Sequence, residues 1–415
     1  MYAAVAGLKT HMQNLNVIGN NVANVNTQGY KAGRSVFRTS IYTSLSGGSN
    51  GTDTVGGRNP SQIGYGSVLS SVDIDMSTGT YNPTGKATDC MIDGDGFFLV
   101  GTKDLAGNLY NDYVSGTFDP KGTSALTLTR VGNFEFKADG YLTDNLGNVA
   151  YGFLCTGYDE TTGKAIFSDQ LVPIRVPGYD SASGEIQYPS EYEYEVDANG
   201  NVNYKDGADA KIGKLEDRKR AVLDKDGKPT TGANGNAVVE DYPKAKLTGI
   251  SIDPATGIIT GMSPDGKPVT VGCIAIGTVN NPNGVTQLSN TYYKAGDGAG
   301  DLTINALGGA ADMMGIKRIF GKAYDAKLAA GGTGGGTGGG TGTGNAVQPS
   351  SAVVDATTIA GGSDTALITS GLEASKTDLA QEISNMIVTQ RGYQANTRII
   401  TVTDSMLEEL VNMKR

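Results

Sequence analysis

The sequence contains few of the residues on which catalytic and metal sites usually depend. Its 415 residues include one histidine, His11, and three cysteines, with no CxxC motif and no Cys/His pair. A zinc site needs such ligands at close spacing, and a catalytic triad needs a histidine in a formed pocket, so we expect neither. We interpret Cys90, Cys155 and Cys273 as buried apolar thiols. We interpret His11 as an ordinary residue of a terminal helix.

Basic charge and long apolar runs are also scarce. The chain has 33 Lys and Arg against 43 Asp and Glu, a net charge of −10. Nucleic-acid binding needs a basic surface, so this balance argues against it. No run of about 18 apolar residues occurs, so no membrane-inserted helix is expected. The first residues lack the basic start of a cleavable signal peptide, and secretion would therefore need another export route.

Two acidic clusters resemble fragments of a calcium loop: Asp93 with Asp95, and Asp224 with Asp226. Neither continues to the glutamate that closes an EF-hand loop, and Asp-Gly pairs are common hairpin turns, so we interpret both as turns. No P-loop or dinucleotide fingerprint follows a strand. Paired carboxylates for glycoside hydrolysis stay open, because they can be distant in sequence. We therefore expect no catalytic residue, no metal and no cofactor.

Both ends of the chain carry apolar residues at seven-residue spacing, which predicts helices that pair as in a coiled coil. An amphipathic helix on an ordinary core would give a similar pattern. A repeat sustained at the chain end favours packing between molecules. The candidate assembly seam consists of Leu8, Leu15, Ile18, Val22, Leu379, Met386, Tyr393, Ile400 and Leu407.

The N-terminal helix is intrinsically weak. Gly7 and Gly19 each cost about 1 kcal/mol relative to Ala. Burying its apolar residues would contribute on the order of 10–15 kcal/mol. Ordering the backbone costs about 1–2 kcal/mol per residue, which is more in total. We therefore predict that both ends stay largely disordered until a partner covers them; strong amide protection in the free chain would contradict this.

The middle of the chain follows a period of two, with 61 glycines in the whole sequence, many of them at turns. Turns are predicted at Asp139-Gly140, Gly147-Asn148, Asn199-Gly200, Thr256-Gly257 and Asp265-Gly266. The fold class is therefore mainly β with terminal α-helices. Residues 331–344 form a Gly/Thr-rich linker, and a short helix is expected within residues 310–330.

The segment Val17–Lys31, VIGNNVANVNTQGYK, closely resembles the N-terminal signature of the flagellar rod and hook family. Asparagine side chains can satisfy backbone groups where a helix ends, and glycine supplies the freedom to leave it. The signature positions are Asn20, Asn21, Asn24, Asn26, Thr27, Gly29 and Tyr30. Further similar segments, which bring the resemblance to about half of the chain, are residues 59–100, 132–153, 249–293 and 372–415.

Within this family, the ending QRGYQANTRIITVTDSMLEELVNMKR is more similar to hook proteins than to distal-rod proteins. The resemblance implies a structural, non-enzymatic subunit that polymerises into a hollow flexible tube and transmits torque. It also implies type III export, an extracellular location at the hook, and rod, hook-cap and hook–filament junction proteins as partners. A distal-rod protein is the alternative within the family. A calcium-dependent surface adhesin is the alternative outside it, and a melting temperature that shifts with calcium would favour the adhesin.

The resemblance also implies a nested arrangement of domains. Residues 1–30 and 371–415 would form the helical assembly domain, and residues 31–70 an extended connector. Residues 71–157 and 247–302 would form an inner β domain, with an outer β domain of residues 158–246 inserted into it. Residues 303–370 have no counterpart in the family and are treated as an insertion.

Overall fold

The computed structural model describes most of the chain and divides it into two units. The described residues are 2–51, 56–103, 126–158, 163–192, 194–196, 202–204, 212–222, 229–230, 237–289, 291–296, 298–300, 302–307 and 365–413. One unit is Met1–Thr80 with Ala374–Arg415, and the other is Tyr81–Glu373. Each is described by itself.

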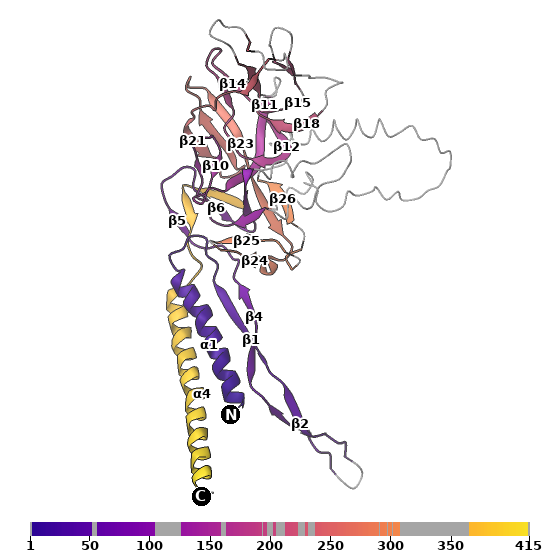
Figure 1. Cartoon of the computed structure of the whole chain (residues 1–415), viewed down its shortest axis with the longest axis vertical. Helices are drawn as coiled ribbons and strands as arrows, with labels where there is room; N and C mark the ends of the chain where they lie inside the picture. Colours follow the sequence, from indigo (N-terminus) through magenta and orange to yellow (C-terminus); the bar gives the residue numbers. More distant parts are fainter. Residues whose placement is uncertain are drawn as a thin grey trace, which may run out of the picture. The chain divides into compact units, whose positions relative to one another are not determined.

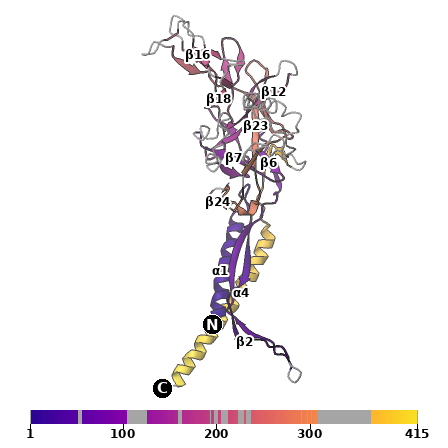
Figure 2. The same cartoon turned by 90° about the vertical axis from the view of Figure 1, so that its right-hand side faces the viewer.

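The first unit contains both long helices of the described chain. Its elements are α1 (Tyr2–Ala23), β1 (Gly33–Thr39), β2 (Tyr42–Ser46), β3 (Ser61–Gly64), β4 (Ser67–Ile74) and α4 (Leu379–Met413). α1 and α4 lie side by side and run antiparallel (Figures 1 and 2). With the β-rich second unit, this confirms the predicted fold class. None of the described helices is both long and apolar enough to cross a membrane.

The described part of residues 31–70 consists largely of strands that pair with one another or with the residues just after them. β1 pairs antiparallel with β4, from Gly33 opposite Ile74 to Thr39 opposite Ser67. β2 pairs with β3 beyond them, so the segment folds back on itself as a ribbon. Pairing satisfies the backbone groups of each strand, and the aromatic and β-branched residues of β1 and β4 favour it.

α1 ends earlier than Gly29, the signature glycine that is suited to the point where the chain leaves the helix. The helix stops at Ala23, and turns follow through Gly29. Gly29 has φ +66°, the left-handed conformation expected for it. The asparagines after Ala23 account for the earlier stop, because their side chains compete for backbone hydrogen bonds.

The second unit consists of short strands. They are β5 (Tyr81–Pro83), β6 (Cys90–Asp93), β7 (Phe97–Gly101), β8 (Thr127–Thr129), β9 (Glu135–Phe136), β10 (Leu142–Thr143), β11 (Val149–Tyr158), β12 (Ala165–Pro173), β13 (Gly178–Asp180), β14 (Glu185–Gln187), β15 (Ser190–Tyr192), β16 (Tyr194–Val196), β17 (Val202–Tyr204), β18 (Ile212–Glu216), β19 (Lys219–Ala221), β20 (Val239–Asp241), β21 (Thr248–Ile252), β22 (Ile258–Met262), β23 (Pro268–Val279), β24 (Thr286–Gln287), β25 (Tyr292–Lys294), β26 (Leu302–Ala306), β27 (Ala366–Thr369) and β28 (Gly371–Glu373), with a 3₁₀ turn, η2 (Pro282–Gly284).

Two long strands organise the main sheet, which has 12 strands among the described residues. β11 pairs with β7, β10, β12 and β23, and β23 pairs with β22, β26 and β7 as well. All of these pairings are antiparallel. The strands between residues 178 and 241 form local two-stranded pairs instead. The proposed division into inner and outer β domains stays a prediction.

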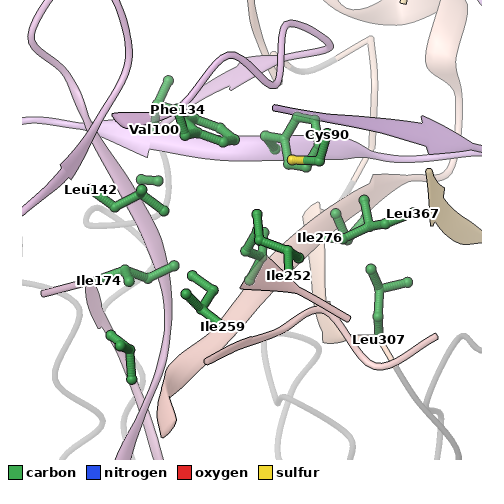
Figure 3. Packing of buried hydrophobic residues seen from close by; sticks show 14 of the residues in the cluster. Cys90, Val100, Phe134, Leu142, Ile174, Ile252, Ile259, Ile276, Leu307 and Leu367 are labelled. Carbon is green, nitrogen blue, oxygen red and sulfur yellow. The ribbon is translucent and has the colours of Figure 1, made fainter. Parts of the chain in front are cut away.

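The core of this unit gathers side chains from strands far apart in sequence. Figure 3 shows Cys90 of β6, Val100 of β7 and Ile276 of β23 pointing into the same apolar interior as Leu367 of β27. Each fully buried side chain of this size contributes about 1.5–3 kcal/mol. Leu367 comes from close to the C-terminal helix in sequence, so the returning chain contributes both to this core and, through β27 and β28, to the strand pairing of the unit.

Predicted turns and cysteine burial are confirmed where the structure describes them. The turn glycines at positions 140, 147, 257 and 266 all have positive φ. The predicted turn at 199–200, the linker at 331–344 and the short helix within 310–330 lie outside the described residues. The three cysteines are buried and free. Burial raises the pKa of Cys155 and Cys273 to about 12, and raises that of Cys90 as well.

A buried ionic cluster ties the region around β18 to the strand end after β12. Arg175 Nε donates to Asp217 Oδ1 over 2.8 Å, and Lys244 Nζ donates to the other carboxylate oxygen. Burial by itself would raise the pKa of Asp217, but the charges of Arg175 and Lys244 hold it below its ordinary value. This carboxylate therefore stabilises the folded chain while it is ionised.

Candidate assembly site in the terminal helices

The row of α1 that faces α4 includes polar residues at seven-residue spacing. Asn14 Nδ2 donates to Thr389 Oγ1 over 2.9 Å, and Asn21 Nδ2 donates to Glu382 Oε1 over 3.0 Å. The two pairs lie seven residues apart on each helix and in opposite directions. They therefore define one antiparallel register.

Glycines let the two helices approach closely in the same register. A Cβ atom on Gly7 would lie 2.7 Å from Asn396 Nδ2, and one on Gly392 would lie 2.8 Å from His11 Cε1. His11 is half-buried between the helices. We call Gly7, His11, Asn14, Asn21, Glu382, Thr389, Gly392 and Asn396 the polar seam.

Several of the predicted apolar seam residues alternate with the polar seam. Ile18 is buried, with 4% of its surface exposed. Met386, Tyr393 and Ile400 are half-buried on α4. Their seven-residue row runs beside that of Glu382, Thr389 and Asn396, as the two apolar rows of a coiled coil do. These four residues therefore belong to packing within the chain.

A second row of α1 packs on the ribbon of the same unit. Thr10 Oγ1 donates to the carbonyl of Ser67 over 2.9 Å. Asn21 Nδ2 donates to the carbonyl of Gly33 over 2.8 Å, and Gly33 N donates back to Asn21 Oδ1. The ribbon therefore supplies α1 with a partner that the sequence did not predict.

A third row of α1 is apolar and is only partly covered within the described chain. It consists of Val5, Leu8, Met12, Leu15 and Val22, again at heptad spacing, with Gly19 in line; we call it the open stripe. Val5 is 50% exposed and Met12 46%. Leu8, Leu15 and Val22 are half-buried. Three of the predicted seam residues thus lie on this stripe.

α4 also leaves many apolar side chains exposed. They are Leu379, Ile383, Ile387, Val388, Ile399, Val402, Met406, Leu407, Leu410, Val411 and Met413. The last turns of α4 extend beyond the start of α1 (Figure 1). Leu379 and Leu407, the remaining predicted seam residues, belong to this exposed set. Apolar surface of this extent is typical of an interface with another molecule.

The signature residues after α1 form a hydrogen-bond network. Asn24 Nδ2 donates to the carbonyl of Asn20, and Thr27 Oγ1 donates to Asn24 Oδ1. Tyr30 Oη accepts from Asn20 Nδ2 over 3.0 Å and donates to Asn21 Oδ1 over 3.1 Å. Burial, followed by the charge of Glu382, raises the pKa of Tyr30. The network fixes the turn by which the chain leaves α1.

Asn26 is the signature residue that lies outside this network, exposed in the turn. Next to the network, two lysines hold the segment that leads out of the unit. The fully buried Lys31 donates from Nζ to the carbonyl of Ser77 over 2.7 Å, and Lys376 Nζ donates to that of Thr78 over 3.3 Å. Lys376 N also donates to the carbonyl of Tyr30, so the outgoing and returning chains meet at the signature.

Of the two acidic clusters in the sequence, the structure describes only the first. Asp93 pairs with Ala366 as part of the β6–β27 ladder. Asp224 and Asp226 lie outside the described residues. Within the part of the chain that the structure describes, no three His, Cys, Asp or Glu side chains gather as metal ligands.

Comparisons with known proteins agree with this architecture at both ends. The model of the flagella basal body rod protein family matches residues 1–31. The model of the C-terminal part of flagellar basal body rod FlgEFG proteins matches residues 369–413. These segments contain α1 with its signature turn and the whole of α4.

Relatives match along the whole chain. Flagellar hook protein FlgE of Borreliella burgdorferi is 28% identical, over 100% of this chain and 99% of its own length. Flagellar basal-body rod protein FlgG of Bacillus subtilis is 26% identical, over 100% and 98%. FlgE of Salmonella typhimurium is 26% identical, over 99% of both. These findings support a protein of the flagellar rod and hook family.

The family resemblance predicted from the sequence is thereby confirmed. A solved structure of flagellar hook protein FlgE2 from Helicobacter pylori covers 53% of this chain and 95% of its own, with 11% identity and a TM-score of 0.28. A similarity at that TM-score has no bearing on the fold.

The polar seam is the part of the site that sequence reasoning missed. The predicted seam consists mainly of apolar residues, whereas the closest contacts between the helices are polar or involve glycine. A signal was available, since Gly7, Asn14 and Asn21 recur every seven residues, as do Glu382, Thr389 and Asn396.

Proposed function

We propose that this chain is the structural subunit of the flagellar hook, which polymerises into a hollow, flexible tube and passes torque from rod to filament. The similarity to hook proteins over essentially the whole chain carries this proposal. It covers the β-rich unit as well as the terminal segments, which rod and hook proteins share.

The uncovered apolar surface of the helices supports assembly as the mechanism. Each half-exposed large apolar side chain would contribute on the order of 1 kcal/mol when a neighbour covers it. Together, the open stripe and the exposed residues of α4 provide enough such surface to offset the cost of association. A head-to-tail contact of this kind repeats without closing, and so generates a helical tube.

The predicted seam residues then divide into two roles. Ile18, Met386, Tyr393 and Ile400 hold α1 and α4 together within one chain. Leu8, Leu15, Val22, Leu379 and Leu407 contact neighbouring copies. Polymerisation would also order whatever part of the helices is disordered in the free chain, since burial of the stripe offsets the loss of conformational entropy.

The finer features of the role follow from the same proposal. The partners are other copies of the chain, the rod, the hook cap and the hook–filament junction proteins, and export uses the flagellar type III apparatus. The location is extracellular. Residues 158–246 form an outer β domain inserted in an inner one, and the chain has no catalytic role.

A distal-rod protein is the second candidate, because a FlgG protein also matches the whole chain. The two roles differ in the shape of the polymer, since a rod is straight and a hook bends.

Electron microscopy of the purified chain at high concentration distinguishes them. The full chain is compared with a variant that lacks residues 1–30 and 372–415, each with and without a hook-cap protein. We expect curved hollow tubes from the full chain and none from the truncated variant. Straight tubes would favour the rod protein. Dispersed particles from the full chain under both conditions would contradict assembly.

A further inference from the structure

The contact between α1 and α4 is more polar than an ordinary helix interface. Asn, Thr, His, Glu and Gly alternate there with Ile18, Met386, Tyr393 and Ile400, while a further apolar row of α1 lies on the open stripe. If affinity alone decided the pairing, α1 would turn its apolar row to α4. The polar seam must therefore be retained for something other than strength.

Size complementarity makes the polar seam specific for one register. The imidazole of His11 lies against Gly392, and the side chain of Asn396 lies against Gly7. A slip of one heptad in either direction would place His11 opposite Ile399 or Asn385, where no glycine leaves room. Within the seam, the observed register is the one in which both large side chains meet a glycine.

Hydrogen bonds add a penalty for other pairings. Asn14, Asn21 and Thr389 each place a polar group between the helices and find a partner there. A buried polar group without a partner is costly, even though a satisfied one contributes little net stability. Polar residues in coiled-coil seams fix register and partner in this manner.

We propose that the polar seam is a specificity device, which fixes α1 on α4 of the same chain in one antiparallel register. His11 with Gly392 and Asn396 with Gly7 are its size-matched keys. Pairing through the seam keeps the open stripe away from α4 of the same chain. The statement that the open stripe is then left for neighbouring copies rests on the proposed function. The statement that the seam fixes the register of α1 on α4 does not depend on it.

Disulfide trapping in the full-length chain tests the register. The in-register variant carries Asn14→Cys and Thr389→Cys, and the slipped variant carries Asn14→Cys and Glu382→Cys. Both are oxidised in the free and the polymerised state, beside the parent chain with its buried cysteines. We expect the in-register pair to form an intramolecular disulfide at least tenfold faster. Equal rates, products between chains, or no disulfide in either state would overturn the proposal.

Exchanging the large and small residues at positions 11 and 392, in the variant that carries Asn14→Cys and Thr389→Cys, tests whether this size match sets the register. Gly392→His places two imidazoles against each other and should slow trapping at least tenfold. Adding His11→Gly restores one large and one small residue, and should bring the rate back to within about threefold of the unmodified keys. If the double variant traps as slowly as the single one, the keys do not set the register. Trapping in the free chain without polymer formation would support the seam and contradict the hook proposal.

Discussion

Replacing Gly392 by alanine probes the close approach of the two terminal helices. The new Cβ atom would lie 2.8 Å from His11 Cε1 and 2.9 Å from Nε2, distances that side chains do not tolerate. Overpacking of this kind costs about 1–3 kcal/mol. Alanine also favours the helix by about 1 kcal/mol relative to glycine, which offsets part of that cost. The helix pair should therefore lose up to about 2 kcal/mol of stability.

Gly19→Ala is the matched control, because a Cβ atom there meets nothing within 4 Å. That variant gains the helix propensity without the clash, so the helix should become about 1 kcal/mol more stable. The two substitutions are chemically identical, and their opposite signs would come from the contact with α4 alone.

Amide hydrogen exchange across α1 in the full-length chain, measured in the state in which the terminal helices are ordered, reports both effects. Protection should fall by up to about 30-fold in Gly392→Ala and rise by about fivefold in Gly19→Ala, since 1.4 kcal/mol corresponds to a factor of ten. Gains of similar size in both variants would show that the helices do not approach as closely as His11 and Gly392 indicate, and would refute the reasoning.

Three further predictions concern other parts of the molecule. Ile400→Leu should leave polymer yield nearly unchanged, whereas Ile400→Asp should abolish polymer on electron micrographs, because it places a charge between α1 and α4; normal yield from the Asp variant would contradict this. Since the folded-state pKa of Asp217 is lowered, its stabilisation is complete above pH about 4 and is lost as pH falls further. Asp217→Asn should therefore destabilise the chain by about 3–5 kcal/mol in thermal melts at pH 7, leaving Arg175 and Lys244 without a counter-charge; an unchanged melting temperature would show that the cluster is not formed. A thiol reagent at pH 8 should label none of the three cysteines until denaturant is added, and rapid labelling of the native chain would contradict their burial.

Local sequence signals predicted the helices and hairpins well. The heptad rows gave α1 and α4, and the predicted Asp-Gly and Thr-Gly turns join β9 to β10, β21 to β22 and β22 to β23. Turn chemistry and helix periodicity act over a few residues, so they can be read directly.

Long-range pairing was less accessible. The β1–β4 ribbon pairs residues that are between 28 apart (Thr39 and Ser67) and 41 apart (Gly33 and Ile74), and the Gly/Ser-rich segment between the strands suggested a connector. The polar seam escaped notice because periodicity searches assume that contact rows are apolar. Gly7 and Gly392 help to determine which face of α1 packs against α4. The effect of their small size can be recognised only when the residues opposite them on the other helix are known.

The central claim is that neighbouring copies cover the open stripe. The most direct test measures the critical concentration for polymerisation of two variants, Met12→Asp and Asn16→Asp. Both add one negative charge to α1. Met12 lies on the open stripe, whereas Asn16 is an exposed polar residue outside it. Burial of an unpaired carboxylate costs at least about 3 kcal/mol, so Met12→Asp should raise the critical concentration by 100-fold or more. Asn16→Asp should change it by less than about threefold, and Met12→Leu should match the parent chain. Equal critical concentrations for the two acidic variants would contradict assembly through this stripe.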